Sequence, residues 1–439
     1  MMTEEQKSLA TPSEAVRTTR PRPRLGLGST LIGREEEELV LEVLRSRRLF
    51  RYSYDLPPEE QGKMAATLER EVCQRMGVRY ALAVTSGSAA LEVALAALGV
   101  GPGDEVILPA WSWVSCFTAV VRLGALPVLA EMDDTFCLAP GEIRRRASAR
   151  TRAVLVMHYQ GAAAEMSSLL AEADELGLPV LEDCAQSPGV LYHGKAVGSM
   201  GKIGIYSFQY QKSITSGEGG MVVTSDPLLY ERAVRAHDLG FYRGHHSIHH
   251  QPRLRPFSGG QFRMSELTAA VALAQLRKLD AIRKHCRGLS ARILTRIGHL
   301  PGLTFRRIPD PGGDSGFEIY FCLPDADLAR LFNERLDARN VNCRRMTGTY
   351  VHYAREYCLE RSVHAEQASP FRHFDKWPAE GYRPCDFPVT EGLIQRFISL
   401  PLGVLYTEED ADHISASVLE VYRELVRESG LPESVLRVS

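Results

Sequence analysis

Lys212 lies in the run SFQYQKSITSGEGG, which extends from Ser207 to Gly220. The lysine follows a short apolar strand by a few residues, a serine precedes it by five positions, and a glycine-rich turn comes after it. A lysine so placed can bind an aldehyde cofactor as a Schiff base, while the hydroxyl of Ser207 reaches a phosphate group. This pattern points to pyridoxal 5'-phosphate. On this segment alone, a solvated loop lysine is the alternative.

Asp183 stands 29 positions before the lysine, at the end of the apolar run LPVL and within the sequence EDCAQ. Ligands of open α/β sheets collect at the carboxyl ends of strands, so an acid at this point is placed for a ligand. A carboxylate beside a pyridine nitrogen keeps that nitrogen protonated, which makes the ring an electron sink. The alternative is a helix N-cap, a position where Asp is also favoured.

A third candidate is the tight turn TSGS, residues 85–88, between the strand-like run YALAV and a helical pattern over 89–98. Backbone amides at a helix start, together with the positive end of the helix dipole, form a phosphate seat. Gly87 allows the backbone to approach a ligand closely. The turn lacks the GxxxxGK[ST] spacing of a Walker loop, and an ordinary turn is the alternative.

Five motifs in this order resemble the DegT/DnrJ/StrS family of pyridoxal-phosphate aminotransferases: TSGSAAL, PAWSW, EDCAQ, SFQ with Lys212, and GEGG. The resemblance runs from about Glu35 to the sequence SLPL at 399–402, which is most of the chain. It implies an α/β fold of the aspartate aminotransferase superfamily, fold type I, with a mostly parallel seven-stranded sheet in the large domain and a smaller C-terminal α/β domain. It also implies a homodimer with shared active sites that aminates a ketone on a sugar or cyclitol.

The resemblance also assigns roles to single residues. Lys212 resembles the Schiff-base lysine, and Asp183 the partner of the pyridine nitrogen. Gln186 resembles the side chain near the phenolic oxygen of the cofactor, and Trp113 the aromatic ring that stacks on it. Trp111, two residues earlier on the same predicted strand face, is the alternative. The phosphate contacts correspond to Gly87, Ser88 and Ser207.

Two positions depart from the family pattern. Gln261 stands where the family more often has Asn, a residue that usually reaches the phosphate of the neighbouring subunit, so the longer side chain puts this contact in question. Gln209 stands where many sugar-nucleotide members have His. A glutamine there resembles the aminocyclitol and 3-amino-5-hydroxybenzoate branches.

The elements that must position these residues follow from periodicity. Short apolar runs recur at 81–84, 106–109, 127–131, 153–158, 180–182, 203–208 and 221–224, with helical segments between them, which predicts a largely parallel sheet covered on both faces. A long amphipathic helix over 267–286 is expected to link two domains. We predict a flexible N-terminal arm over 1–34, a large domain over 35–286 and a small domain over 287–439. In the small domain we expect a strand at 319–323, a helix at 328–338 and a final helix opened by Thr407.

Composition excludes several other classes of protein. The chain of 439 residues has a net charge of −2, which gives no general attraction to nucleic acid. Its nine cysteines contain no CxxC pair, and the first residues have no apolar signal core, so we expect a cytoplasmic protein with reduced thiols. The apolar stretch 114–130 contains Arg122 and is typical of a helix, a turn and a strand, not of a membrane span.

His245, His246, His249 and His250 predict a mobile polar loop near the dimer interface in preference to a metal site.

The expected reaction is a ping-pong transamination, with glutamate or glutamine as the donor by family resemblance and Lys212 as both anchor and general base. The segments 49–52 and 241–251 are candidates for lining the acceptor site, and natural-product biosynthesis is the expected context. One alternative is a dehydratase or aromatising enzyme of the 3-amino-5-hydroxybenzoate synthase type. Sugar dehydratases of the family have His in place of the lysine, so the presence of Lys212 disfavours sugar dehydration but not the aromatising activity. The other alternative is a regulatory protein that holds the cofactor without turnover.

Overall fold

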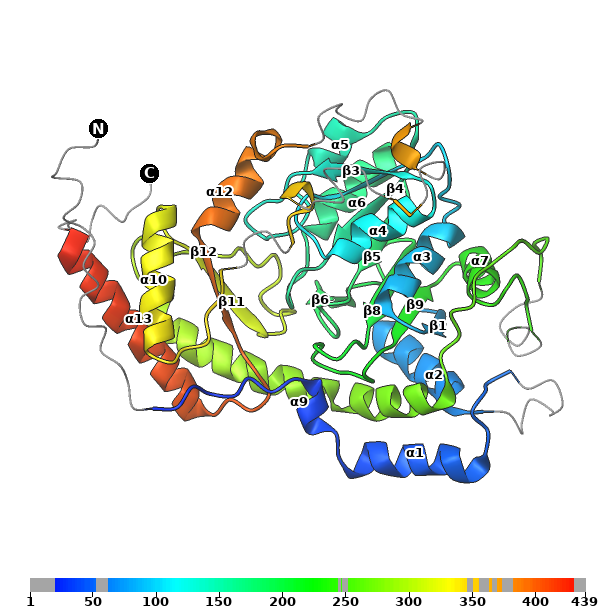
Figure 1. The fold of residues 1–439 in the computed structure, drawn as a ribbon, viewed down its shortest axis with the longest axis horizontal. Helices are drawn as coiled ribbons and strands as arrows, with labels where there is room; N and C mark the ends of the chain where they lie inside the picture. Colours follow the sequence, from blue (N-terminus) through cyan, green and yellow to red (C-terminus); the bar gives the residue numbers. More distant parts are fainter. Residues whose placement is uncertain are drawn as a thin grey trace.

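The structure is a computed structural model that describes residues 20–52, 62–243, 246, 252–345, 350–354, 363–364, 369–372 and 382–429. Its largest element is a seven-stranded sheet with the strand order β1-β9-β8-β5-β4-β2-β3 (Figure 1). The strands are β1 (Tyr80–Val84), β2 (Glu105–Pro109), β3 (Leu126–Ala130), β4 (Thr151–Met157), β5 (Val180–Asp183), β8 (Ile203–Ser207) and β9 (Gly220–Thr224). Only β9 runs against its neighbours; the others are all aligned in one direction.

The sheet confirms the fold class and all seven predicted strands. Nearly every strand residue is buried, which explains the continuous apolar runs, because helices cover both faces. The helices of this part of the molecule are α1 (Arg34–Ser46), α2 (Met64–Met76), α3 (Gly87–Ala97), α4 (Val114–Arg122), α5 (Glu142–Arg146), α6 (Met166–Glu175) and α7 (Pro227–His237), and a two-stranded ribbon joins β6 (Leu191–Tyr192) to β7 (Lys195–Ala196). Each of the described helices is too short or too polar to serve as a membrane span.

A second, smaller sheet has the order β10-β11-β12 and is antiparallel. Its strands are β10 (Thr304–Phe305), β11 (Glu318–Cys322) and β12 (Phe397–Pro401), and the helices beside it are α10 (Ala326–Ala338), α12 (Pro388–Arg396) and α13 (Glu408–Ser429). The predicted strand 319–323 and helix 328–338 are confirmed within one or two residues. The capping signature at Thr407 is also confirmed, because Thr407 and Asp410 exchange hydrogen bonds of 2.9 and 3.2 Å between side chain and backbone at the start of α13.

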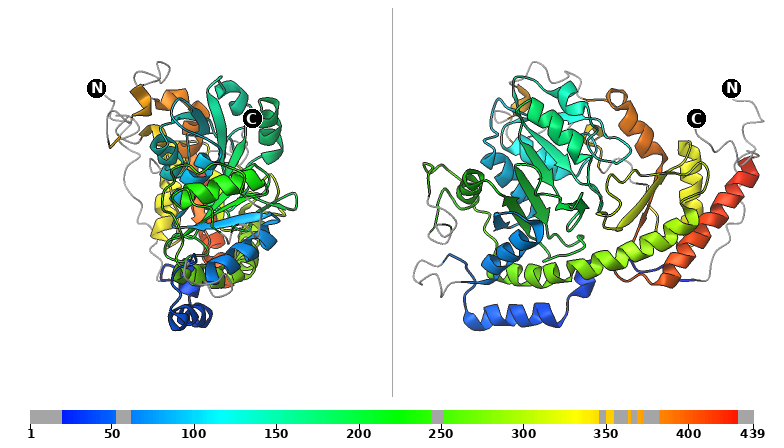
Figure 2. Two further views of the ribbon diagram at one scale, coloured as in Figure 1. Left: turned by 90° about the vertical axis from the view of Figure 1, so that its right-hand side faces the viewer. Right: turned by 180° about the vertical axis from the view of Figure 1, so that it is seen from behind.

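One long helix, α9 (Glu266–Ile297), runs beneath both sheets (Figures 1 and 2). Its residues up to Cys286, such as Leu276 and Ile282, contribute to the core of the large sheet. Its last turns contribute Leu289, Ile293 and Ile297 to a separate core around the small sheet. The helix therefore continues for eleven residues beyond the predicted end at Cys286. Its apolar residues pack first against the core of the large sheet and then against the core of the small sheet, with no interruption of the helix. The domain limits at 34 and 286 remain proposals.

The segment 20–28 has no regular secondary structure up to Gly28, and it runs along the helices beside the small sheet before it reaches the loop of Lys212. Its contacts to the small sheet and its helices include an ion pair from Arg20 to Asp410 of 2.8 Å and a hydrogen bond from the Leu405 amide to the Leu25 carbonyl of 3.2 Å. At its other end, the Gly28 amide donates to the Lys212 carbonyl at 3.2 Å. Gly28 fits there because a Cβ atom would lie 2.5 Å from the Ser213 carbonyl oxygen.

Of the four clustered histidines, only His246 lies within the described residues. It is fully buried and its Nδ1 lies 2.9 Å from the Tyr230 hydroxyl, with the rings of Tyr52 and Tyr242 beside it. The expectation of a mobile polar loop is therefore wrong for His246, because three tyrosine rings offer it an enclosed site. His245, His249 and His250 lie outside the described residues, as does the part of the 241–251 segment around them.

His237, at the end of α7, predicts a pH dependence of stability. Burial and the nearby guanidinium groups of Arg51 and Arg263 lower its pKa to about 4. Below pH 6.5 the unfolded chain binds a proton at His237 that the folded chain does not, so acid destabilises the fold between pH 6.5 and pH 4. We expect His237→Asn to reduce this loss by up to about 3 kcal/mol.

The measurement is urea unfolding at a series of pH values for the native protein and the variant. Exposed His285 provides the matched control, and His285→Asn should leave the pH profile unchanged. Parallel profiles for the native protein and His237→Asn would contradict the assignment.

Candidate active site

The predicted site residues converge because four aligned strands end at the same edge of the large sheet. β1 leads into the turn before α3, β2 into the PAWSW segment, β5 ends at Asp183, and β8 leads into the loop that carries Lys212. The carboxyl ends of aligned strands form the edge at which open α/β sheets bind ligands. Topology thus gathers residues that are more than a hundred positions apart in the chain.

Lys212 lies at this edge of the sheet, in the lining of two cavities. The protein surrounds the amine closely, and this burial lowers its pKa, while the negative charge of Asp183 acts in the opposite direction. A lowered pKa increases the fraction of neutral amine, which is the form that attacks an aldehyde and accepts a proton.

Asp183 is almost fully buried, with 2% of its surface exposed. Its Oδ1 accepts a hydrogen bond of 2.9 Å from the Ala185 amide, and its Oδ2 accepts one of 3.1 Å from the Cys116 thiol. Burial and the adjacent carboxylate raise the pKa of Cys116 well above its ordinary value, so the thiol keeps its proton and remains a donor. These two donors orient the carboxylate toward the cavity.

The neighbouring acid, Glu182, has a different task because successive side chains of a strand point to opposite faces. Its carboxylate accepts hydrogen bonds of 2.5–2.7 Å from the backbone amides of residues 198, 200 and 201, and it lies 2.9 Å from His158 Nε2. With Cys184, this cluster has metal-ligating atom types, all buried. The four donors already occupy the carboxylate, so Glu182 holds the 198–201 loop against the sheet.

The start of α3 forms the predicted anion seat. Ser86 is its N-cap and accepts a hydrogen bond of 3.0 Å from the Ala89 amide. The two amides before Ala89, those of Gly87 and Ser88, have no carbonyl of the same helix to bond. A Cβ atom on Gly87 would lie 2.7 Å from Cβ of Ser207, so glycine allows this close approach. Ser207 and Ser88 therefore lie on the same wall as these amides.

The two tryptophans of PAWSW are separated by the structure. β2 ends at Pro109, so the prediction that both lie on one strand face is wrong. Trp111 is fully buried among Tyr159, Tyr350 and Phe397. Trp113 precedes α4, is 41% exposed and lines the cavity. Trp113 is therefore the ring that can stack on a ligand.

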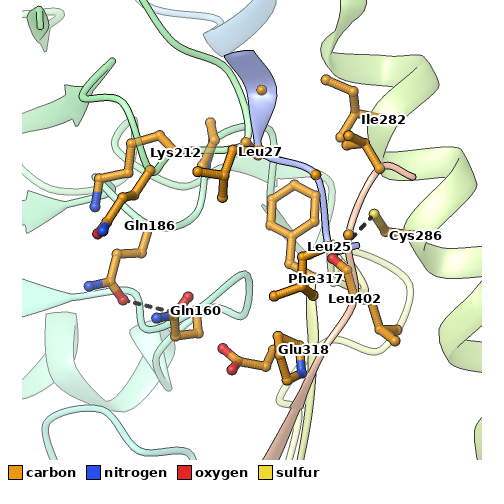
Figure 3. A pocket seen from close by; sticks show the side chains of 18 of the residues that line it. Leu25, Leu27, Gln160, Gln186, Lys212, Ile282, Cys286, Phe317, Glu318 and Leu402 are labelled. Carbon is orange, nitrogen blue, oxygen red and sulfur yellow. Dashed lines mark hydrogen bonds between the residues drawn. The ribbon is translucent and has the colours of Figure 1, made fainter. Parts of the chain in front are cut away.

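Two adjoining cavities meet at Lys212. The smaller, of about 140 Å³, is lined by Lys212 and by every other predicted site residue but one: Gly87, Ser88, Trp113, Asp183, Gln186 and Ser207. The larger, of about 530 Å³, extends from Lys212 and Gln186 toward the small sheet (Figure 3). Gln261 is exposed and lies outside both linings. Its proposed contact with a neighbouring subunit stays a prediction.

Sequence reasoning missed several residues of these walls, namely Ser115, Gln160, Glu318, Arg344 and Tyr350. Ser115 Oγ lies 2.7 Å from Ser88 Oγ, and the Gln160 amide donates to Gln186 Oε1 at 3.3 Å. Only Glu318 had a sequence signal, since it is a charged residue that opens a strand-like run. The ring of Tyr350 lies 5.5 Å from that of Trp113 but comes from an irregular segment.

Comparison with known proteins identifies the family. The model of the DegT/DnrJ/EryC1/StrS aminotransferase family matches residues 33–419. The chain belongs to this family. It is therefore a pyridoxal-phosphate-dependent aminotransferase, as the sequence motifs indicated.

Solved structures of the same fold support this assignment. A 3-amino-5-hydroxybenzoic acid synthase is 25% identical, with a TM-score of 0.73 over 92% of this chain and 100% of that chain. DesV from S. venezuelae is 26% identical, with a TM-score of 0.75 over 92% of this chain and 99% of that chain. The aminotransferase PseC from Helicobacter pylori, involved in the biosynthesis of pseudoaminic acid, has the same fold at 22% identity, with a TM-score of 0.71 over 92% of this chain and 100% of that chain.

The aminotransferase site fits the cofactor by the chemistry of its groups. It combines a buried primary amine, a buried carboxylate with its hydrogen-bond donors already placed, and a helix N-terminus next to two serine hydroxyls. We propose that Lys212 holds the aldehyde carbon, that Asp183 faces the ring nitrogen, and that Gly87, Ser88 and Ser207 hold the phosphate. Trp113 and Gln186 then contact the ring.

The first test of these roles is Lys212→Ala. Purified native protein should show the visible absorption band of a lysine-bound cofactor, and the variant should lack it because no other amine lines either cavity in the described part of the chain. Exposed Lys202 gives the control, since Lys202→Ala should keep the band. An unchanged spectrum of Lys212→Ala would remove the lysine from this role.

Proposed function

We propose that this aminotransferase moves the amino group of glutamate or glutamine to a ketone on a cyclitol or sugar, in the biosynthesis of a natural product. The observation that carries the proposal is the pair of adjoining cavities. One holds the groups suited to the cofactor, and the other offers room for an acceptor directly beside Lys212. Its volume of about 530 Å³ is typical of sites for small molecules.

Lys212 performs the proton transfer in this proposal. When bound, pyridoxal phosphate withdraws the electron pair left at the substrate carbon. The neutral amine of Lys212, released when the donor takes its place, accepts the proton from that carbon. In the second half-reaction it delivers a proton to the carbon of the acceptor that receives the amino group. Burial favours this neutral amine, because the charged form loses hydration inside the protein. The same amine serves both halves of a ping-pong reaction.

The site is also proposed to be completed by a second subunit. The exposed residues Leu49 and Phe50 lie beside the segment that follows Gln261, because the Leu49 carbonyl accepts a hydrogen bond from the Glu266 amide and the Arg263 guanidinium lies over the Phe50 ring. In a homodimer, Gln261 would reach the phosphate of the partner's cofactor. Gel filtration and the cofactor affinity of Gln261→Ala test this arrangement.

One alternative function has specific support. The 3-amino-5-hydroxybenzoic acid synthase is among the similar structures, and the glutamine at position 209 lies in the cofactor cavity. An aromatising enzyme of this type would convert its substrate without an amino donor. Dependence on an added donor therefore distinguishes the two functions.

Asp183→Asn tests the ring-nitrogen partner. The amide keeps the shape of the carboxylate but cannot hold a proton on the nitrogen, so the first half-reaction with glutamate or glutamine should slow by about a hundredfold or more. The visible band should remain, because Lys212 is intact. Rapid-mixing spectroscopy measures the rate, and Asp327→Asn, at an exposed position, is the control. A near-normal rate would remove Asp183 from this role.

The decisive experiment is a screen of amino donors, followed by a screen of keto acceptors. Addition of the correct donor should abolish the visible band of the lysine-bound cofactor, and addition of the correct ketone should restore it. We expect a response to glutamine or glutamate. A protein that responds to no amino acid but converts a cyclic ketone would favour the aromatising function.

A further inference from the structure

A set of buried polar side chains lies next to Asp183. The carboxylate accepts a hydrogen bond of 3.1 Å from the thiol of Cys116 on α4. Ser112 stands two residues before the start of α4, and its Oγ lies 2.6 Å from Nε2 of His352. Ser112 and Cys116 are fully buried, and 1% of the surface of His352 is exposed. Polar groups in such a place are hydrogen-bonded as a rule, because an unpaired one loses hydration without compensation.

Ser112 also acts on Cys116. Burial and the charge of Asp183 raise the pKa of the thiol well above its ordinary value, whereas a hydrogen bond from the Ser112 side chain acts in the opposite direction. A hydroxyl has this effect when it directs its proton at the sulfur, since that stabilises negative charge there. The hydroxyl has only one proton, so its oxygen is then the acceptor for Nε2 of His352.

His352 reaches this place because the segment 350–354, between α10 and α12, is fastened to the end of β2. The Ser112 amide donates to the Tyr350 carbonyl at 3.0 Å, and the His352 amide donates to the Ala110 carbonyl at 3.1 Å. These two backbone hydrogen bonds fix the histidine opposite Ser112. The histidine, which is 169 positions from Asp183 in the chain, is thereby connected to it through two side chains.

A serine beside a histidine can also be a nucleophile with its general base. A nucleophile must meet its substrate, but Ser112 is fully buried and belongs to the lining of neither cavity. The pair therefore acts inside the protein. The functional group that it reaches there, through Cys116, is the carboxylate of Asp183.

We propose that His352, Ser112 and Cys116 form a hydrogen-bond chain that positions Asp183 against the ring nitrogen of the cofactor. The inference rests on the proposed role of Asp183 and adds three positioning residues to it. Nε2 of His352 donates to the Ser112 hydroxyl, which donates to the sulfur of Cys116. The thiol in turn donates to Oδ2 of Asp183. Donors that point in one direction polarise one another, so each link strengthens the last hydrogen bond.

The last hydrogen bond has two effects on the carboxylate. With the Ala185 amide on Oδ1, the thiol on Oδ2 fixes the rotation of the Asp183 side chain. A donor also stabilises the negative charge of a carboxylate, and this negative charge is what holds a proton on the ring nitrogen. The buried thiol keeps its own proton, because its pKa is raised well above the ordinary value, and so it remains a donor.

The test is nitrogen NMR of the protein loaded with pyridoxal phosphate that carries an isotope label at the ring nitrogen. The chemical shift reports whether this nitrogen is protonated, without any turnover. We expect Cys116→Ala to move the shift toward that of an unprotonated ring and to slow the first half-reaction by about tenfold, because a hydrogen bond to a charged group is lost. Cys116→Ser, which differs from the alanine variant by one hydroxyl donor, should restore both. Cys322→Ala, at a buried thiol of β11, is the matched control.

Ser112→Ala and His352→Phe test the more distant links. The first removes the hydroxyl with little loss of volume, and the second keeps a ring next to Phe117, whose centre lies 5.4 Å from that of the histidine. Both variants should move the nitrogen shift in the same direction as Cys116→Ala, by a smaller amount. A native shift in either variant would overturn the proposed chain, which would then end at Cys116.

The remaining outcomes separate this inference from the role of Asp183. Equal effects of Cys116→Ala and Cys116→Ser would show that the thiol only fills space, and would overturn the chain. An unprotonated ring nitrogen in the native protein would contradict the role of Asp183 itself. A protonated nitrogen that responds to Asp183→Asn but not to Cys116→Ala contradicts the chain alone. Because the shift is measured without a donor, a failed search for the donor leaves this result intact.

Discussion

The structure depends on the burial of one amine against one carboxylate. An ammonium group moved out of water loses hydration, which destabilises the charged form of Lys212. The attraction of Asp183 offsets only part of this loss, so the pKa of Lys212 is lowered. The protein tolerates this because the strand ends hold both groups in place, and because the Cys116 thiol and the Ala185 amide satisfy the carboxylate first. The amine is thus kept in a reactive state by its surroundings, and the fold supplies the energy that this state requires.

Two cores joined by one helix explain why the site lies where it does. α9 belongs to the core of the large sheet up to Cys286 and to the core of the small sheet from Leu289, and the larger cavity is lined by residues from both parts of the molecule. The proposed cofactor contacts come from the large sheet, and Glu318 and Pro401 of the small sheet line the opposite wall of the larger cavity. The walls of the larger cavity therefore come from both sheets, so its shape depends on how the two cores are held together.

The fold and most of the site could be predicted from the sequence because their signals are local. Each chemical group follows a buried apolar strand, and parallel strands bring their ends together whatever the distance along the chain. Trp111 and Trp113 could not be separated, because they lie beyond the end of β2, where strand alternation no longer applies. Arg344 and Tyr350 carry no signal, since an irregular segment gives no periodicity. Glu318 was visible only as a charge at a strand start, and its hydrogen bonds to Tyr320 and Ser399 follow from the pairing of β11 with β12.

The amino-terminal segment adds a mechanical link between these layers. Its contacts with Asp410 and Leu405 attach it to the small-sheet half, and its Gly28 amide holds the backbone of Lys212 itself. Widening of the cleft between the sheets would have to extend this segment or detach it from the lysine's carbonyl. The segment 25–28 thus acts as a tether, so a change in the separation of the two halves would pull on the backbone that carries the reactive amine.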